Sequence, residues 1–360
     1  MSDRVPARER IDAALGRITA AVTRPTQLME VCGTHTMAIG RHGLRSLFPK
    51  HLRLLSGPGC PVCVTPGSDV DQAIDLARRP GTLVATFGDM LRVPGNRRET
   101  LDAARAQGAR VRIVYSALDA VELARGDAGT EVVLIGVGFE TTSPTIAAAM
   151  LRAVSDGVRN FSVLPAFKLV PPAMAALCAA KDVRIDGFLC PGHVSAIIGT
   201  RPYEAIARDA RVPCAVAGFE ALDILEGVVE LVEQLRHGKH EVSNRYARVV
   251  HAEGNPTAQK LLAEVFEVTD AAWRGIGVIP RTGLGIRAEY EAFDARKRFG
   301  LPPSSPDDLP EGCSCGQVMR GVIVPTECPL FARACTPATP IGPCMVSSEG
   351  ACAAYHKYGG

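Results

Sequence analysis

The sequence has few aromatic residues, almost no net charge and no long apolar run, and each absence excludes a class of protein. Aromatic residues make up 5% of the 360 residues, while Ala and Val dominate, which favours α/β layers over an aromatic-rich β-sandwich. Forty Lys and Arg against 38 Asp and Glu leave a net charge of +2, so no electrostatic footprint for nucleic acid or an anionic membrane is present. The longest apolar runs, such as Val132–Val137, have the length of a strand and cannot span a bilayer.

No secretory signal is visible either, because residues 1–18 are charged and predict a helix. We therefore expect a soluble, cytoplasmic protein. In a reducing compartment, twelve cysteines indicate metal or redox chemistry rather than structural disulfides. Six of the twelve lie at or after residue 313, so we expect the metal near the C-terminus.

The first 250 residues repeat one pattern: a short β-branched run, a loop with Gly or Pro, and an Ala-rich amphipathic stretch. The expected strands are Leu28–Cys32, Leu52–Ser56, Leu83–Phe87, Val111–Tyr115, Val132–Val137, Asn160–Pro165, Gly187–Cys190 and Cys214–Ala217. Helical patterns between them include Asp69–Arg78, Glu99–Gln107, Pro144–Val154 and Ala221–Leu235. This alternation predicts parallel sheets built of βαβ units.

Two doubly wound sheets fit these strands better than one large sheet. The RGDAGT segment, within Ala124–Thr130, interrupts the pattern, so we expect α/β domains at residues 1–125 and 126–250. Residues 251–360 would form a third unit. It contains a helix at Pro256–Val265, the segment GIGVIPRTGLGIR, a charged helix at Glu289–Phe299, and a Cys-rich end too poor in periodicity to fold without a bound metal.

The first motif, LMEVCGTHT, places Cys32 at the end of a strand and before a helix. Backbone N–H groups and the positive end of that helix would lower the pKa of the thiol and favour the thiolate. His35 would then hydrogen-bond the thiolate or its ligand. The alternative is a small Cys buried at a tight turn.

The second motif, SGPGCPVCVTPG, contains Cys60 and Cys63 as a C-x-x-C pair between a strand and a helix. This placement resembles that of thioredoxin-like redox pairs and suits a reversible disulfide or metal binding. Half of a zinc site is the competing interpretation, but no second C-x-x-C is present to complete it.

Two further motifs follow strands. In IGVGFETTSPT, the side chains of Glu140, Thr141 and Thr142 converge at a predicted helix N-terminus, where they either act in the site or only cap the helix. In FLCPGHVSAIIG, His193 lies just beyond a strand end, where parallel sheets bind their ligands, and it is either a site residue or a hydrogen-bonded structural histidine. The GFE of Gly138–Glu140 recurs at Gly218–Glu220, again after a strand, although coincidence explains three residues equally well.

The remaining cysteines divide into two groups. Cys178, Cys190 and Cys214 have no partner spacing, and we interpret them as core residues. The C-terminal group predicts a metal site: a [4Fe–4S] cluster takes four thiolates and would leave two cysteines over, while zinc also accepts four thiolates. The members of this group are Cys313, Cys315, Cys328, Cys335, Cys344 and Cys352.

In this order, the motifs CGTHT, GPGCPVC, GFETT and PGHV and the C-terminal cysteine block resemble the HypD family of hydrogenase maturation proteins. The resemblance runs from Cys32 to Cys352. It implies two Rossmann-like domains plus a small C-terminal iron–sulfur domain, and a scaffold on which the Fe(CN)2CO unit of nickel–iron hydrogenase is assembled. Whether such a scaffold turns over as an enzyme is left open.

The resemblance also implies roles for individual residues. The family's cluster spacing, C-x14-C-x6-C-x16-C, falls on Cys313, Cys328, Cys335 and Cys352. Cys315 and Cys344 would then form a redox-active dithiol beside the cluster, as in ferredoxin:thioredoxin reductase. Cys32 would bind the iron that receives cyanide and carbon monoxide. A HypC-type chaperone would share that iron, and a HypE-type protein would deliver the cyanide as a thiocyanate.

These roles suggest an electron relay, because releasing cyanide from a thiocyanate consumes electrons. Our hypothesis from the sequence is that electrons pass from the cluster through Cys315 and Cys344 toward Cys60, Cys63 and the iron. One rival is a cluster-dependent thiol–disulfide oxidoreductase, which leaves CGTHT without a role. The other is a zinc-stabilised binding module.

Overall fold

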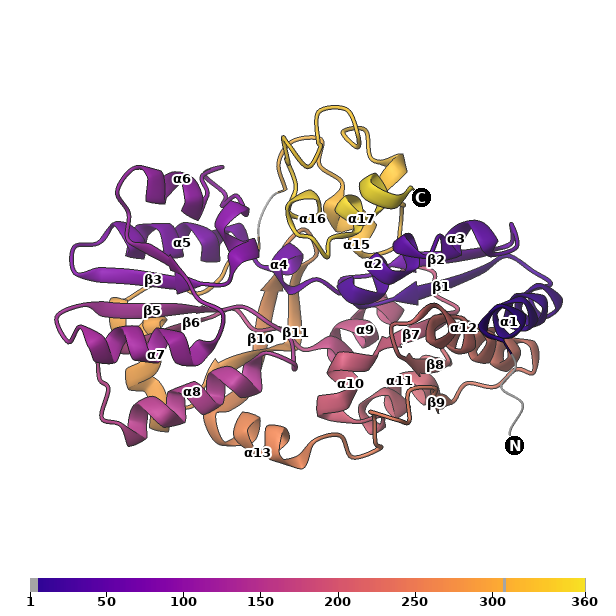
Figure 1. Ribbon diagram of the computed structural model, residues 1–360, viewed down its shortest axis with the longest axis horizontal. Coiled ribbons are helices and arrows are strands. Elements are labelled where there is room, and N and C mark those ends of the chain that lie inside the picture. Colours follow the sequence, from indigo (N-terminus) through magenta and orange to yellow (C-terminus); the bar gives the residue numbers. More distant parts are fainter. Residues whose placement is uncertain (1–5, 307–308, 360) are drawn as a thin grey trace.

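Two parallel sheets, one in each lobe of the molecule, form the framework of the computed structural model, which describes residues 6–306 and 309–359 (Figure 1). Sheet A has the strand order β2-β1-β7-β8-β9. Its strands are β1 (Thr26–Glu30), β2 (Leu52–Ser56), β7 (Gly187–Pro191), β8 (Cys214–Ala217) and β9 (Val242–Asn244). Sheet B has the order β4-β3-β5-β6. Its strands are β3 (Thr82–Thr86), β4 (Val111–Ile113), β5 (Glu131–Gly136) and β6 (Phe161–Pro165).

All pairings within these two sheets are parallel, as predicted, and each of the eight expected strands is present. The expected division of the chain is wrong. The RGDAGT segment is only the turn between a helix and β5, and β5 pairs with β3, which we had assigned to the first domain. Sheet A is instead completed by β7, whose Gly187 lies opposite Leu28 of β1. The chain therefore leaves sheet A after β2, builds sheet B, and returns.

Helices cover both faces of each sheet, as βαβ crossovers require. Those packed around sheet A are α1 (Ala7–Ala21), α2 (Gly33–Arg41), α3 (Leu44–Leu47), α9 (Val170–Ala179), α10 (Gly192–Ile198), η2 (Arg201–Tyr203), α11 (Glu204–Asp209) and α12 (Ala221–Arg236). Those around sheet B are α5 (Gly67–Arg78), η1 (Gly88–Arg92), α6 (Leu101–Ala106), α7 (Ala117–Gly126), α8 (Ser143–Ser155) and α13 (Pro256–Val265).

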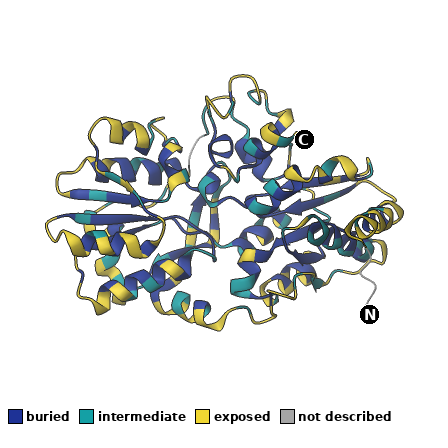
Figure 2. Cartoon of the chain, in the orientation of Figure 1, coloured by how far each residue is buried: buried dark blue, intermediate teal, exposed yellow. Residues whose placement is uncertain are grey.

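The core lies between each sheet and its helices. Figure 2 shows the strands as largely buried and the outer helix faces as exposed. Alternate faces of β5 supply different cores, because Leu134 packs toward α7 and α8 while Val133 packs toward α5. Each fully buried Val or Leu stabilises the fold by roughly 2 kcal/mol. Among the described residues, no helix combines the length and apolar character needed to cross a bilayer.

An antiparallel ribbon joins the two lobes. It consists of β10 (Phe266–Trp273) and β11 (Gly277–Ile286), which the sequence analysis did not recognise as strands. One end of the ribbon, with Phe266 and Ile286, packs in the core of sheet B, whereas Trp273 at the other end belongs to the core of sheet A. Residues 256–286 therefore brace the two sheets instead of belonging to a separate C-terminal unit.

The charged helix expected at Glu289–Phe299 is broken into two pieces. A 3-10 turn, η3 (Ala288–Phe293), is followed by the short helix α14 (Ala295–Phe299). Asp294 separates them because its carboxylate accepts a hydrogen bond from the backbone N–H of Arg296 at 2.8 Å and so caps α14.

Residues 309–359, which we call the tail, lie over the junction of the two lobes (Figure 1). The tail contains only short elements: α15 (Cys315–Met319), η4 (Pro325–Glu327), α16 (Pro343–Val346) and α17 (Ala351–Tyr358). It packs against α2 through α17 and against α4 (Pro61–Val64) through α16. The tail thus contacts the loops that follow β1 and β2.

Candidate functional site

The candidate site begins where β1 ends. The chain turns through Cys32, the N-cap of α2, and the buried carboxylate of Glu30 accepts a hydrogen bond from the Cys32 backbone N–H at 3.0 Å. The hydroxyl of Thr36 donates to the other oxygen of the same carboxylate. Burial raises the pKa of Glu30 to about 7. Glu30 therefore fixes the turn that presents Cys32.

The Cys32 thiol is not the low-pKa thiolate that the sequence suggested. Its sulfur does accept hydrogen bonds from backbone N–H groups of the first turn of α2, as expected. Burial nevertheless raises the pKa of Cys32 to about 12, and the nearby carboxylates of Glu30 and Glu349 act in the same direction. Desolvation of the charge outweighs the helix N-terminus, so a metal ion would have to displace the proton.

The GPGC loop that follows β2 packs directly on this turn. The backbone N–H of Gly33 donates to the carbonyl of Gly59 at 2.9 Å. A Cβ atom at Gly59 would lie 2.1 Å from the backbone nitrogen of Cys32, so only glycine fits there. This close approach sets the first two motifs side by side.

A cavity of about 420 Å³ opens in front of Cys32. Thr141, from the loop after β5, and His193, at the start of α10, line it together with Cys32. The tail contributes Glu349, whose carboxylate accepts a hydrogen bond from the Thr34 hydroxyl at 2.9 Å. Loops from both sheets and the tail therefore converge on one cavity.

The two histidines of the site both lie close to one aromatic ring. Phe219, from the second GFE sequence, has its ring 4.8 Å from that of His35 and 4.0 Å from that of His193. His35 is fully buried and donates from Nε2 to the carbonyl of Gly218 at 2.8 Å. Burial lowers the pKa of His35 to about 4, so its ring is neutral. Its imidazole thus supports the wall of the cavity rather than bonding the Cys32 sulfur, as expected earlier.

The side chains of the GFETT loop point in two directions. Thr141 and Thr142 line the cavity, whereas Glu140 turns inward and accepts a hydrogen bond from the backbone N–H of Val170, the first residue of α9, at 2.9 Å. Burial raises the pKa of Glu140 to about 7. No side chain of the loop caps α8 itself. The capping interpretation assigned Glu140 to the start of α8, whereas its carboxylate lies at the start of α9.

Cys60 and Cys63 form a disulfide in α4 and its N-cap. Both residues are buried, with 5% and 1% of their surface exposed. The tail covers them: Sγ of Cys60 lies 3.3 Å from Oγ of Ser347, and Sγ of Cys63 lies 3.8 Å from the carbonyl oxygen of Pro343. The redox pair expected from C-x-x-C thus lies beneath the segment that contains Cys344.

The tail thiols interact with one another. Hydrogen bonds from the thiols of Cys315 and Cys344 lower the pKa of Cys352, and the same contacts raise the pKa of Cys344. A hydrogen bond with Cys315 and burial raise the pKa of Cys313. Cys335 accepts a hydrogen bond from the backbone N–H of Ile341 at 3.4 Å. Cys315, Cys344 and Cys352 therefore form one hydrogen-bonded group of thiols.

The donor set of the tail suits a soft metal or an iron–sulfur cluster. A Cβ atom at Gly342 would lie 2.5 Å from Sγ of Cys313 and 2.6 Å from Sγ of Cys315, so the backbone there makes room for sulfur. Cys328 precedes a loop that closes at the bridge between Phe331 and Cys335. Within the described residues, no three Cys, His, Asp or Glu side chains already stand as metal ligands. The tail therefore offers the sulfur donors that a cluster takes as ligands.

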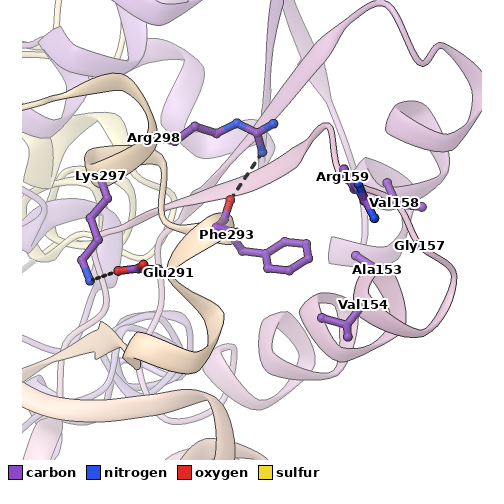
Figure 3. A pocket seen from close by; sticks show the side chains of 10 residues that line it. Ala153, Val154, Gly157, Val158, Arg159, Glu291, Phe293, Lys297 and Arg298 are labelled. Atoms are coloured by element: carbon purple, nitrogen blue, oxygen red, sulfur yellow. Dashed lines mark hydrogen bonds and ion pairs between the residues drawn. The ribbon is translucent and has the colours of Figure 1, made fainter.

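The other cysteines and cavities do not add to the site. Cys190 and Cys214 are fully buried and hydrogen-bonded to each other, and Cys178 is partly buried beside them, which agrees with their interpretation as core residues. A larger cavity of about 760 Å³ lies between the end of α8 and the η3–α14 segment, beside Phe293 (Figure 3). The described side chains that line it include no Cys or His.

Two residues of the site and its surroundings, Glu349 and Phe219, were not predicted from the sequence. Glu349 belongs to the segment SSEG between Cys344 and Cys352. A carboxylate in this polar segment was the only feature of the sequence that could have indicated a site residue. Phe219 belongs to the GFE repeat, whose recurrence was noticed but not assigned a role. Both are placed by contacts between segments distant in sequence, Thr34 with Glu349 and His35 with Phe219.

Fold and site together define an α/β protein with two parallel sheets and a thiol-rich site where their loops and the tail meet. A family model described as "HypD: Hydrogenase formation hypA family" matches residues 9–359. The chain belongs to the HypD family of hydrogenase maturation factors.

Curated relatives agree along nearly the whole chain. Hydrogenase maturation factor HypD2 of Bradyrhizobium diazoefficiens is 45% identical over 350 residues, covering 95% of this chain and 92% of that protein. Hydrogenase maturation factor HypD of Rhizobium leguminosarum bv. viciae is 47% identical, with 93% and 89% covered. A putative hydrogenase expression/formation protein of Methanocaldococcus jannaschii is 41% identical, with 92% of each chain covered.

Proposed function

We propose that this protein is a scaffold on which the Fe(CN)2CO unit of nickel–iron hydrogenase is assembled, with the iron held by Cys32. The observation that supports this most directly is the convergence of Cys32, His193 and Glu349 on one cavity, beside the buried Cys60–Cys63 disulfide. A thiolate is a soft ligand that suits low-spin iron with cyanide and carbon monoxide. The cavity of about 420 Å³ has room for an iron ion with three small diatomic ligands.

The cavity also offers groups that can act on those ligands. His193 is an exposed residue at the cavity wall, partial desolvation lowers its pKa, and its imidazole can accept a hydrogen bond from a ligand in the cavity. Glu349 is held by a hydrogen bond from Thr34 and adds a carboxylate to the lining of the cavity. In this arrangement the protein binds the iron through one thiolate and leaves other coordination positions for the incoming ligands.

We propose that the tail holds a [4Fe–4S] cluster through Cys313, Cys328, Cys335 and Cys352, with Cys315 and Cys344 as an adjacent dithiol. When bound, such a cluster supplies single electrons. The hydrogen bonds between the thiols of Cys315, Cys344 and Cys352 support a common site for the ligands and the dithiol.

The Cys60–Cys63 disulfide is suited to store electrons next to the iron. Its reduction takes up two electrons and two protons and yields two thiols, and the reverse reaction returns both electrons. Gly59, adjacent to Cys60, touches Cys32, so these electrons are released beside the proposed iron ligand. Reductive cleavage of a thiocyanate, R–S–C≡N, also needs two electrons and one proton, and it yields R–SH and cyanide. One dithiol therefore matches one delivered cyanide.

The proposed partners follow from the same chemistry. A HypE-type protein would present the thiocyanate on its C-terminal cysteine, and a HypC-type chaperone would share the iron through its N-terminal cysteine. Both would have to reach the cavity in front of Cys32. The lining of this cavity includes Thr34 of α2, Thr141 of the loop after β5 and His193 of α10.

Burial of the disulfide argues against the rival function, a general thiol–disulfide oxidoreductase. Attack on another protein's disulfide requires an accessible thiol, and Cys63 is only 1% exposed beneath the tail. A small thiocyanate-bearing segment entering the cavity is compatible with this burial, whereas a folded protein disulfide is not.

The variant Cys63→Ala tests this role. The disulfide cannot form in the variant, so we expect hydrogenase maturation in cells to fall to background while the visible spectrum of the tail cluster stays unchanged. Cys178→Ala, which removes a partly buried thiol outside the site, is the matched control and should mature hydrogenase normally. A normal hydrogenase yield from Cys63→Ala would contradict the proposed use of the disulfide.

A further inference from the structure

A second cavity, of about 350 Å³, lies where the end of sheet B meets the ribbon of β10 and β11. Its walls come from the end of β6 and the residues after it (165–168), from both strands of the ribbon, and from Pro303 and Ser304 on the way to the tail. Among the described residues, none lines both this cavity and the one in front of Cys32. The second cavity is therefore a separate place where a small molecule can bind.

One wall of this cavity contains a buried lysine. Lys168 lines the cavity and is only 2% exposed. Within the part of the chain that the structure describes, its ammonium donates one hydrogen bond, to the carbonyl of Ala166 at 3.2 Å, and pairs with no carboxylate. An ammonium has three N–H donors, so two remain for a ligand. Burying an unpaired charge costs free energy, and an anion beside Lys168 would offset this cost.

The charged groups around Lys168 already have partners of their own. Arg296 pairs with the buried carboxylate of Asp69 at 2.7 Å, and the two act on Lys168 in opposite directions: Asp69 favours its charged form and Arg296 opposes it. The other acidic residues of the lining, Asp270 and Asp294, accept hydrogen bonds from backbone N–H groups. Burial is the largest influence and lowers the pKa of Lys168 to about 8.

Much of the remaining lining is apolar. Phe167 and Leu284 are buried in the core of sheet B, with 2% and 9% of their surface exposed, and both line the cavity. Val278 of β11 adds an aliphatic side chain that is 55% exposed. A ligand in this cavity would therefore meet one positive charge without an anionic partner and, elsewhere, aromatic and aliphatic carbon.

We propose that this cavity binds a small organic monocarboxylate, whose carboxylate pairs with Lys168 while its carbon chain packs against Phe167, Leu284 and Val278. One unpaired cation calls for one negative charge, and apolar walls favour a carbon chain over an inorganic anion. The site lies next to the GFETT loop, since the backbone N–H of Lys168 donates to the carbonyl of Gly138 at 3.0 Å. It does not depend on the proposed role of Cys32.

Isothermal titration calorimetry of the full-length protein with butyrate and with benzoate tests the proposal. At least one of them should bind saturably, with one molecule per chain, and its uncharged amide should bind about tenfold more weakly or not at all. Lys168→Met keeps an apolar stem without the charge and should weaken binding about tenfold or more. Lys260→Met, at an exposed lysine of α13, is the matched control and should bind as the wild type does.

Three results of the titration would overturn the proposal. The first is a wild type that binds neither carboxylate saturably. The second is equal binding of the carboxylate and its amide, because the charge would then play no part. The third is a folded Lys168→Met variant that binds as tightly as the wild type, or a loss in Lys260→Met as large as that in Lys168→Met.

Methylation of lysines in the wild type gives an answer even if Lys168→Met does not fold. An amine whose pKa is about 8 is partly neutral at that pH and should react with formaldehyde and cyanoborohydride. At about ten times its dissociation constant, the carboxylate should slow methylation of Lys168 about tenfold and leave Lys260 unaffected, as measured by mass spectrometry. Equal rates at Lys168 with and without the carboxylate, or no reaction of Lys168 at all, would overturn the proposal.

Discussion

The thiols at the edge of sheet A and the thiols of the tail are held in place by different means. Cys32 and Cys60 follow strands β1 and β2, which are neighbours in a parallel sheet, so strand pairing alone brings their loops together. The tail has only short helices, and its cysteines make up much of what is buried there. A sheet can therefore preform a thiol site without metal, whereas the tail depends on its contacts with the sheet and on what it binds.

Removing metal should affect the two groups most differently. We expect a chelator under anaerobic conditions to speed proteolytic cleavage within residues 309–359 on the order of 1000-fold, because metal-binding energy is folding energy in a segment with little core. Cleavage within either sheet should change little. Limited proteolysis with mass spectrometry measures both rates. Equal acceleration in all regions would show that the tail depends on metal no more than the sheets do.

The contact between Gly59 and Cys32 tests how tightly the sheet edge is built. Gly59→Ala should lower the free energy of unfolding by roughly 4 kcal/mol, because the new Cβ would overlap the Cys32 backbone. Gly16→Ala is the control, since nothing lies within 4 Å of its Cβ position in α1. It should stabilise the protein by about 1 kcal/mol. Urea unfolding measures both, and a neutral Gly59→Ala would mean that the loops separate easily.

The pH dependence of stability reports on Glu140, which is part of the framework between the sheets. Its pKa is raised from 4.5 to about 7 by burial, so the folded state binds the proton more tightly than the unfolded state. Stability should therefore fall as pH rises from about 4.5 to about 7, by about 3 kcal/mol from this residue.

Glu140→Gln keeps the oxygen that accepts from Val170 but cannot ionise. As the pH rises from about 4.5 to about 7, the free energy of unfolding of Glu140→Gln should increase relative to that of the wild type. Outside this interval the difference between the two proteins should stay constant. Glu253→Gln, at an exposed carboxylate paired with Arg201, should show no such gain. If the stabilities of the wild type and of Glu140→Gln depend on pH in the same way, burial does not raise the pKa of Glu140 as described.

The smallest expected effect concerns a single hydrogen bond between the tail and α2. Thr34→Val removes the bond from the Thr34 hydroxyl to Glu349 and should weaken docking of the tail by about 1 kcal/mol. Hydrogen exchange of residues 343–352 should quicken about fivefold. Thr19→Val, in which a surface hydroxyl of α1 is lost, should leave this exchange unchanged. Unchanged exchange in Thr34→Val would mean that other contacts hold the tail.

Local pattern predicted the strands and helices around the site well. Each expected run from Leu28–Cys32 to Cys214–Ala217 overlaps a strand, because buried parallel strands are continuous apolar runs between glycines. The pairing of these strands was not predictable in the same way. β1 pairs with β7, more than 150 residues later, and nothing in either segment identifies its neighbour.

The rest of the site depends on burial and on distant contacts, which periodicity does not report. The pKa of Cys32 was expected to be low from its place at a helix start, but the tail covers the turn through Glu349, and desolvation prevails. β10 was missed because its residues alternate weakly, with exposed Glu267 and Val268 beside each other. Of the residues that the motifs named, Cys32, Thr141 and His193 line the cavity, and only the fold shows that Glu140 is directed toward α9 instead.

The most direct test of the account is an infrared spectrum of the protein, purified without oxygen from cells that also produce its proposed maturation partners. Metal-bound cyanide and carbon monoxide absorb in the triple-bond region, where proteins are otherwise transparent. We predict bands there for the wild type and none for Cys32→Ala with an unchanged tail cluster. A blank spectrum from wild-type protein that contains the cluster, or bands that persist in Cys32→Ala, would contradict the assignment of Cys32 as the iron ligand.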